Sequence, residues 1–252
     1  MASLTEIETV LNRELDRDSF TDYAPNGVQV RGREQVQRIV TGVSACVALF
    51  EAAVDQKADL ILVHHGLFWD KESRVVAGSM KRRLQILLQQ DITLMAYHLP
   101  LDAHPQYGNN IQIIKKLALT PVAPFGFYRG RPLSFMATTA GQQEFSGFVE
   151  RLQQLFGTSI TLFPFGPSTI QRIAVCSGGA PELASEAVAQ RADLFLTGEV
   201  SEPLFHYAQE EGLNVIGAGH HQTERWGVQA VGAFIAERFG VTHQFIDIKN
   251  PV

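Results

Sequence analysis

The feature that most constrains the fold of this chain is an internal duplication. Residues 37–65 align with residues 171–199 without a gap. The matched residues are Gln37-Arg38-Ile39 with Gln171-Arg172-Ile173, Ala53-Val54 with Ala187-Val188, Gln56 with Gln190, Ala58-Asp59-Leu60 with Ala192-Asp193-Leu194, and Leu62 with Leu196. Self-similarity of this kind indicates a repeated supersecondary unit. We therefore expect two copies of one structural unit.

Each copy has the pattern of a strand, a helix and a second strand. β-Branched residues fill the expected strands, and apolar residues recur at helical spacing between them. The expected strands are 38–43 and 59–63 in the first copy and 172–176 and 193–197 in the second, with helices over about 47–56 and 182–190. Such a unit pairs its strands in parallel through a right-handed crossover. The predicted class is α/β, with pseudo-twofold related repeats and mixed, mainly parallel sheets.

The duplication also sets the predicted domain organisation. Residues 1–120 form the first α/β repeat, and residues 121–252 form a connection and the second repeat. Before the first copy, segment 4–15 places its leucines and isoleucine on one helical face. The connection contains one strand-like run, 133–139, and one helix-like run, 144–156, among several Gly and Pro residues.

Composition narrows the class of protein. The 252 residues carry a formal net charge of −5, which argues against a broad basic surface for nucleic acid. The two cysteines are too few for a disulfide framework or a thiolate metal site. We find no N-terminal signal peptide and no apolar run long enough to span a membrane. The expected location is the cytoplasm.

Three histidine-containing segments each follow an expected strand. They are Val63-His64-His65-Gly66, Tyr97-His98 with Asp102 four residues after the histidine, and Gly219-His220-His221 with Glu224 four residues after His220. Aligning residues 92–98 with 214–220 places His98 on His220 and Asp102 on Glu224. Imidazole and carboxylate groups at strand ends are typical of metal sites in α/β proteins. A pseudo-twofold arrangement would bring these two histidine-carboxylate segments to one site.

Each of these signals is weak when taken alone. Adjacent strand residues point to opposite faces, so His64 and His65 reach one cleft only if the strand ends at Gly66, and then they hint at two metals. His220 and Glu224 share one face of an expected helix over 223–239, which a surface pair would also do. Asp102 follows a proline that argues against regular helix, so its partners are expected to come from loop geometry.

Together the motifs resemble the Nif-three-like family, whose members are also called GTP cyclohydrolase I type 2 homologues. The resemblance covers essentially the whole chain and rests on Asp22-Tyr23-Ala24-Pro25-Asn26-Gly27, Leu62-Val63-His64-His65-Gly66-Leu67-Phe68-Trp69, Tyr97-His98-Leu99-Pro100-Leu101-Asp102, Thr197-Gly198-Glu199 and Gly219-His220-His221-Gln222-Thr223-Glu224-Arg225. The chain is similar to the short form, which lacks a long central insertion. The resemblance implies two intertwined repeats, a toroidal homohexamer and a di-metal centre between the repeats. The implied metal ligands are His64, His65, Asp102, His220 and Glu224.

This mixed donor set suits zinc, manganese, iron, nickel or cobalt better than calcium or magnesium. Two such ions can lower the pKa of a water and stabilise both oxygens of a hydrolysis, with Glu224 or Asp102 as the candidate bridging carboxylate. His98 is a candidate proton shuttle or substrate contact, or else a packed histidine. Glu199 is a candidate for orienting a ligand, or else a helix cap. Phe68 and Trp69 could stack on a base or belong to the core.

The leading functional hypothesis is a di-metal-dependent hydrolase that acts on a nucleotide or related heterocycle. The metal-binding part of this hypothesis rests on the residues named above, and the substrate part rests on the family resemblance. The sequence has no phosphate-binding loop of the G-x-x-x-x-G-K-[ST] type, so a triphosphate would need metals and scattered basic residues such as Arg225. The alternative is a non-enzymatic metal-binding scaffold whose ring presents a surface to a partner, with nucleic acid in its central opening as a version that the acidic charge disfavours. A third alternative is a metal buffer that binds exchangeable ions weakly and has no turnover.

Overall fold

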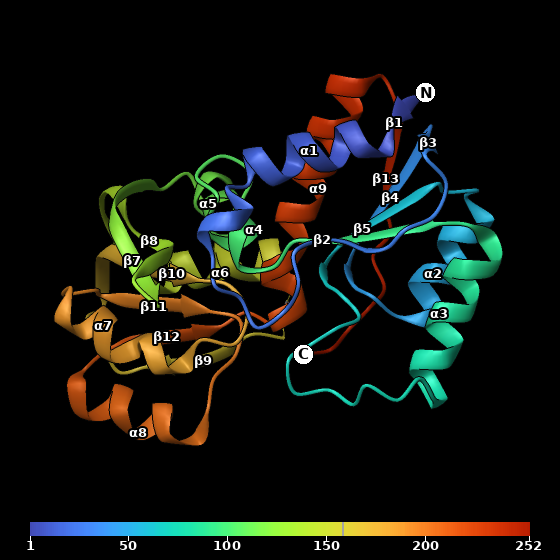
Figure 1. Cartoon of the computed structure of the whole chain (residues 1–252). Helices are drawn as coiled ribbons and strands as arrows, with labels where there is room; N and C mark the ends of the chain where they lie inside the picture. The colour runs from blue at the N-terminus through green and yellow to red at the C-terminus, as the bar shows by residue number, and fades with distance from the viewer. Residues whose placement is uncertain (158) are drawn as a thin grey trace. The chain divides into compact units, whose positions relative to one another are not determined.

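The fold was analysed in a computed structural model, which describes residues 1–157 and 159–252. The chain has a mixed α/β fold, as the sequence predicts. It divides into two compact units (Figure 1): unit 1 comprises residues 1–101 and 227–249, and unit 2 comprises residues 102–226 and 250–252. The chain passes from unit 1 to unit 2 within α4 (Leu99–Ala103) and returns within α9 (His220–Phe239). The sequence predicts another division of the chain, into repeats 1–120 and 121–252. These boundaries differ from those of the two units, and the repeats stay a prediction.

Unit 1 is built on a five-stranded sheet with the order β13-β4-β5-β6-β2. Its strands are β2 (Gly27–Val30), β4 (Arg38–Ser44), β5 (Leu60–His65), β6 (Thr93–Ala96) and β13 (Thr242–Phe245). β13, β4, β5 and β6 run in parallel, and β2 pairs antiparallel with β6. The remaining elements are β1 (Ala2–Ser3), α1 (Leu4–Glu14), η1 (Arg17–Ser19), β3 (Gln35–Val36), α2 (Val47–Asp55) and α3 (Gly78–Gln90).

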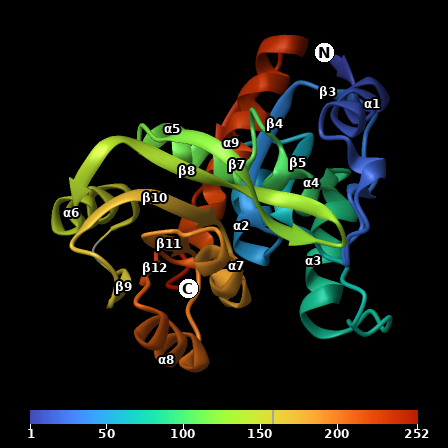
Figure 2. The same cartoon turned by 90° about the vertical axis from the view of Figure 1, so that its left-hand side faces the viewer.

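Unit 2 contains a six-stranded sheet with the order β7-β8-β10-β11-β12-β9. Its strands are β7 (Thr120–Tyr128), β8 (Arg131–Glu144), β9 (Thr161–Pro164), β10 (Thr169–Cys176), β11 (Leu194–Thr197) and β12 (Asn214–Gly217). The central strands β10, β11 and β12 are parallel, whereas the long, bent β8 and its partner β7 add an antiparallel half (Figure 2). The helices are α5 (Asn109–Lys116), α6 (Phe145–Phe156), η2 (Pro181–Leu183), α7 (Ala184–Ala189) and α8 (Glu202–Glu211).

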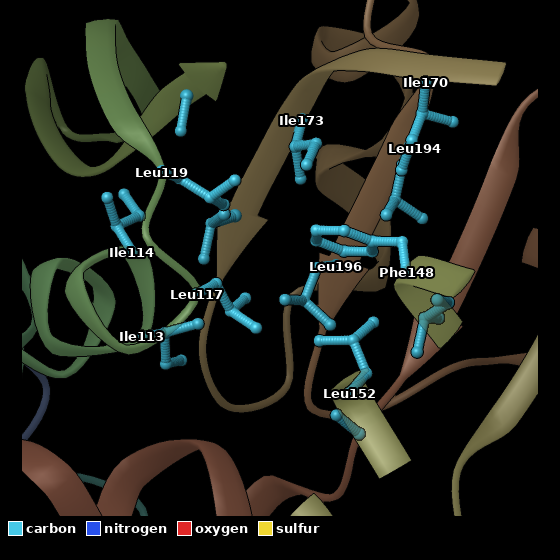
Figure 3. Close-up of a cluster of buried hydrophobic side chains, with 14 of the residues drawn as sticks. Ile113, Ile114, Leu117, Leu119, Phe148, Leu152, Ile170, Ile173, Leu194 and Leu196 are labelled. Carbon is cyan, nitrogen blue, oxygen red and sulfur yellow. The ribbon is translucent and has the colours of Figure 1, made fainter. Parts of the chain in front are cut away.

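Each unit buries its own hydrophobic core against its sheet. In unit 1, Phe50 of α2 and Leu87 of α3 pack with Ile61 and Val63 of β5. In unit 2, Phe148 and Leu152 of α6 lie against the strand residues Ile173, Leu194 and Leu196 (Figure 3). Strands β5, β11 and β12 are buried at nearly every position, as parallel strands covered on both faces are.

The duplicated sequence forms the same local structure twice. β4-α2-β5 and β10-α7-β11 are both strand-helix-strand units with parallel strands, as the sequence predicts. One carboxylate oxygen of Asp59 accepts the backbone N–H groups of Gln37 and Arg38, at 2.8 and 3.0 Å. One oxygen of Asp193 accepts those of Gln171 and Arg172, at 2.8 and 2.7 Å. The matched aspartates therefore fasten the start of each copy in the same way.

Candidate metal-binding clusters

Three imidazoles lie together in unit 1. His64 and His65 are the last two residues of β5, and His98 follows β6, the neighbouring parallel strand. One ring nitrogen from each of the three lies within 4.8 Å of the others. The ring centroids of His64 and His65 are 4.7 Å apart, so both imidazoles approach the same place although they are adjacent in the chain. Because they stand at the very end of the strand, the alternation of its two faces does not separate them.

Hydrogen bonds fix which nitrogen of His64 can bind a metal. The side chain is fully buried, and its Nδ1 lies 2.9 Å from the backbone oxygen of Tyr97. A carbonyl oxygen can only accept, so Nδ1 carries the proton and donates it. In the neutral ring the lone pair is then on Nε2, and this arrangement is typical of histidine ligands to metals.

His98 is held in the same tautomer by a carboxylate. Its Nδ1 lies 2.9 Å from Oδ1 of Asp22, and its backbone N–H donates to Oδ1 of Asn26 at 2.7 Å. Burial alone would raise the pKa of Asp22, but hydrogen bonds from His98, Asn26 and the backbone of Leu99 lower that pKa. The ionised carboxylate accepts from Nδ1, which leaves Nε2 of His98 as the basic nitrogen.

In unit 2, His220 stands between two carboxylates. His220 and Glu224 lie four residues apart in the first turns of α9, and His220 Nε2 is 3.0 Å from Glu224 Oε2. Its Nδ1 is 2.6 Å from Oε1 of Glu199, which follows β11. Burial alone would lower the pKa of His220, but the hydrogen bonds and charges of Glu224 and Glu199 raise it to about 9. The same negative surroundings favour a divalent cation in place of the proton.

Asp102 is the second buried carboxylate of unit 2. Its Oδ1 accepts hydrogen bonds from Asn109 Nδ2 at 2.9 Å and from Ser177 Oγ at 3.2 Å. A carboxylate oxygen of Asp102 and one of Glu224 lie within 4.8 Å of each other, and both side chains are buried. Two ionised carboxylates this close repel each other in a medium of low dielectric constant unless a cation or a proton lies between them.

Gly178 leaves room for the Glu224 side chain. Its φ is +70°, and an added Cβ would lie 2.2 Å from Glu224 Oε1. Its N–H donates to Thr223 Oγ1 at 3.0 Å, which ties the end of β10 to the first turn of α9. A glycine at a close backbone approach is therefore part of the unit 2 cluster.

Three local expectations from the sequence are wrong. Helix α9 begins at His220 rather than at residue 223, so both His220 and Glu224 are helical. Asp102 lies in the short helix α4, because Pro100 stands in its first turn, where a missing N–H costs no helical bond. Val63 and Thr197 match in the duplication, and they accept from the backbone N–H groups of Tyr97 and Ala218. These hydrogen bonds make Tyr97 equivalent to Ala218, and His98 therefore equivalent to Gly219, one residue from the expected match with His220.

The sequence analysis gave no role to several residues that hold the clusters, although Asp22 and Asn26 belong to a motif that carries the family resemblance. Asp22 and Asn26 hold His98, and Asn109 and Ser177 hold Asp102. They are not adjacent to their partners in the sequence, so no local spacing indicates them. The Gly178-Gly179 pair, which follows Ser177 just after β10, is a signal of close backbone approach near that serine.

The chain belongs to the family described as Duf34/NIF3 (NGG1p interacting factor 3), which matches residues 2–251. It is 44% identical over 249 residues to a protein of Pseudomonas aeruginosa named GTP cyclohydrolase 1 type 2 homolog, a match that covers 99% of this chain and 98% of that protein. It is 41% identical over 253 residues to the protein of the same name from Escherichia coli, covering 98% of each. The family predicted from the sequence motifs is thus confirmed.

Solved structures share the fold over the whole chain. The protein ybgI, described as of unknown function, has a TM-score of 0.94 and 40% identity, covering 99% of this chain and all of that one. A protein of Thermus thermophilus, TTHA1606, has a TM-score of 0.90 and 35% identity, covering 99% of this chain and all of that one. HcgD from Methanocaldococcus jannaschii, at 21% identity and a TM-score of 0.84, shows a shared fold alone.

Proposed function

We propose that this protein is a di-metal-dependent hydrolase that binds two divalent ions per chain through His64, His65, Asp102, His220 and Glu224. The observation that carries the proposal is the pair of buried carboxylates, Asp102 and Glu224, with oxygens within 4.8 Å of each other. Burying two like charges at this distance is costly, and a bound cation removes the cost. The lone pair assigned to Nε2 of His64 supplies a neutral donor that is compatible with this role.

The donor chemistry selects a class of metal. Imidazole nitrogens and carboxylate oxygens together suit zinc, manganese, iron, nickel or cobalt. Divalent ions held by such groups would supply a water of lowered pKa and would stabilise developing negative charge during hydrolysis. The chain's own contribution is to hold its ligands in the correct tautomer before any metal arrives.

His98 and Glu199 have supporting roles in this proposal. Asp22 holds His98 so that its Nε2 can accept or return a proton, as a general base or acid does. Glu199 accepts from Nδ1 of His220 at 2.6 Å, which orients His220 and directs its Nε2 toward Glu224. Glu199 therefore acts through His220 rather than on a substrate.

The proposed substrate is a nucleotide or a related nitrogen heterocycle. Support comes from the relatives named GTP cyclohydrolase 1 type 2 homolog, at 44% and 41% identity.

In the described residues, no helix has the length and apolarity required to cross a membrane. We further propose a cytoplasmic protein that assembles as a ring-shaped homohexamer. Light scattering coupled to size-exclusion chromatography will show a mass of about six chains if this is correct.

The test is the metal content of the purified protein, measured by inductively coupled plasma mass spectrometry beside a hydrolase panel. We expect about two ions per chain in the wild type and a clear loss in both Glu224→Ala and His64→Ala. The control is His206→Ala, because His206 and Glu202 form a similar but exposed pair on α8, with 3.6 Å between Nε2 and Oε1. That variant should keep its metal and its activity.

Two results would contradict the proposal in different ways. Absence of bound metal, even after reconstitution with the metals named above, removes the basis for the hydrolase. Stoichiometric metal without turnover on any nucleotide or heterocycle, with loss of the ring when Glu224 is replaced, favours a metal-dependent scaffold instead. The two readouts are independent, because metal content is measured before any substrate is added.

A further inference from the structure

A cavity of about 550 Å³ opens in unit 1 on the side of Asp22, the residue that holds His98. It is lined by Asp22, Ala24 and Pro25, by the segment that connects β5 to α3, and by Met80 in the first turn of α3. The backbone N–H of Asp70 donates to the backbone oxygen of Tyr23 at 3.1 Å, which joins the first two of these walls. The volume is in the range of small-molecule sites.

Aromatic rings lead from this cavity to the imidazole cluster. Trp69 lines the cavity, and its ring centroid lies 5.3 Å from that of His98 and 5.8 Å from that of His65. Tyr23 contacts both Trp69 and His98, at 5.7 and 4.9 Å between centroids. A molecule stacked on Trp69 therefore lies next to the proposed metal ligands.

The cavity wall is apolar, with charge of mainly one sign. Phe68, Val76 and Met80 line it, and Phe68 is 36% exposed, so this aromatic ring after β5 is not a core residue. Asp70 and Glu72 provide two exposed carboxylates against the single guanidinium of Arg74, and the carboxylate of Asp22 is buried and bonded to His98. An acidic, aromatic surface suits a neutral or cationic planar ring with N–H donors, and it repels a polyphosphate.

We propose that this cavity binds the planar nitrogen heterocycle of the substrate, stacked against Phe68 and Trp69, and leaves any phosphate outside it. The inference rests on the proposed function and deepens it, because it assigns the part of the substrate that this surface recognises. Exocyclic amino groups of the ring would donate to Asp70 and Glu72. The ring would then lie beside the basic nitrogen of His98.

The test is tryptophan fluorescence in a Trp226→Phe background, where Trp69 is the remaining tryptophan of the two in the chain. The probes are guanosine, the cationic 7-methylguanosine, and GTP. We expect saturable quenching by both nucleosides, with tighter binding of the cationic one. Phe68→Ala should weaken the binding of both nucleosides by about tenfold, because a stacking partner is lost. The matched control is Phe127→Ala, which removes another exposed phenyl ring, from β7 in unit 2.

Two further variants separate this inference from the proposed hydrolase. GTP and guanosine are both titrated into Glu224→Ala, so that phosphate binding at the metal ligands does not contribute. GTP should bind to this variant more weakly than guanosine does. Glu72→Gln should reduce the preference for 7-methylguanosine. Nucleoside binding that survives in Glu224→Ala supports the cavity even if no turnover is found. No saturable quenching, GTP binding tighter than guanosine, or equal losses in Phe68→Ala and Phe127→Ala would overturn it.

Discussion

The two copies of the strand-helix-strand unit begin alike and end differently. Asp59 and Asp193 bind the start of their own copies through the same pair of backbone hydrogen bonds. At the carboxyl ends, the first copy has His65, whereas the second has Glu199 at the matching position. One scaffold thus presents an imidazole at this position in the first copy and a carboxylate in the second. The backbone contacts that start each copy, which support the fold, are shared. The side chains at the carboxyl ends, which could bind a metal, differ.

The largest expected effect concerns the aspartates that hold the start of each copy. Asp59→Ala should lower the free energy of unfolding by about 4 kcal/mol, because two backbone donors lose a charged acceptor. Asp193→Ala should cost about half as much, about 2 kcal/mol, because Asp59 also pairs with Arg33 at 3.2 Å and is the more buried of the two. Urea denaturation of both variants measures the difference. Equal small losses would show that the aspartates do not fasten the two copies.

The second prediction compares a proposed ligand with the residue that orients one. Glu224→Gln should weaken metal binding by more than about 100-fold, whereas Glu199→Gln should weaken it by about 10- to 100-fold. Competition with a fluorescent chelator gives both affinities. Glu202→Gln, on the exposed pair of α8, is the control and should change nothing. If Glu199→Gln had the larger effect, the assignment of the two roles would be reversed.

A third prediction concerns pH in the metal-free protein. The pKa of His220 is raised to about 9 in the folded state, above its value of about 6.5 in an unfolded chain. The folded state therefore binds more protons in this range, so the stabilisation is fully present below pH of about 6.5 and is lost as the pH rises through about 9. Melting curves across this range should fall more steeply for the wild type than for His220→Gln. Parallel curves would contradict this linkage.

The smallest effect comes from exchanging a residue between the copies. Ser44 and Gly178 occupy matching positions in the duplication, and Ser44 Oγ lies 3.0 Å from Nδ1 of His65. Gly178→Ser should cost about 1 to 2 kcal/mol of stability and also weaken metal binding, because a Cβ there meets the Glu224 carboxylate at a positive φ. Ser44→Gly should cost about 1 kcal/mol. A fully stable Gly178→Ser variant with normal metal affinity would show that Glu224 can move aside.

The sequence predicts the scaffold well because periodicity and duplication are local signals. The expected strands over 38–43 and 193–197 lie within one residue of β4 and β11 at each end. It also indicates the histidines and carboxylates that the structure gathers within each unit. It does not indicate Asn109 or Ser177, because their contacts with Asp102 depend on packing between distant segments. The one-residue error at His98 has the same origin, since hydrogen-bonded register rather than residue similarity decides which positions are equivalent.

The hydrogen bonds of His64 and His220 have a consequence for how the protein would take up metal. The Tyr97 carbonyl already holds His64 with a proton on Nδ1, so this residue can bind a metal through Nε2 without a change of tautomer. His220, with a pKa of about 9, is protonated at neutral pH and must lose its proton before it can coordinate. Metal uptake at neutral pH should therefore acidify the solution. The heat of binding should depend on the ionisation enthalpy of the buffer, and the released proton should come from His220, which lies between Glu199 and Glu224 in unit 2.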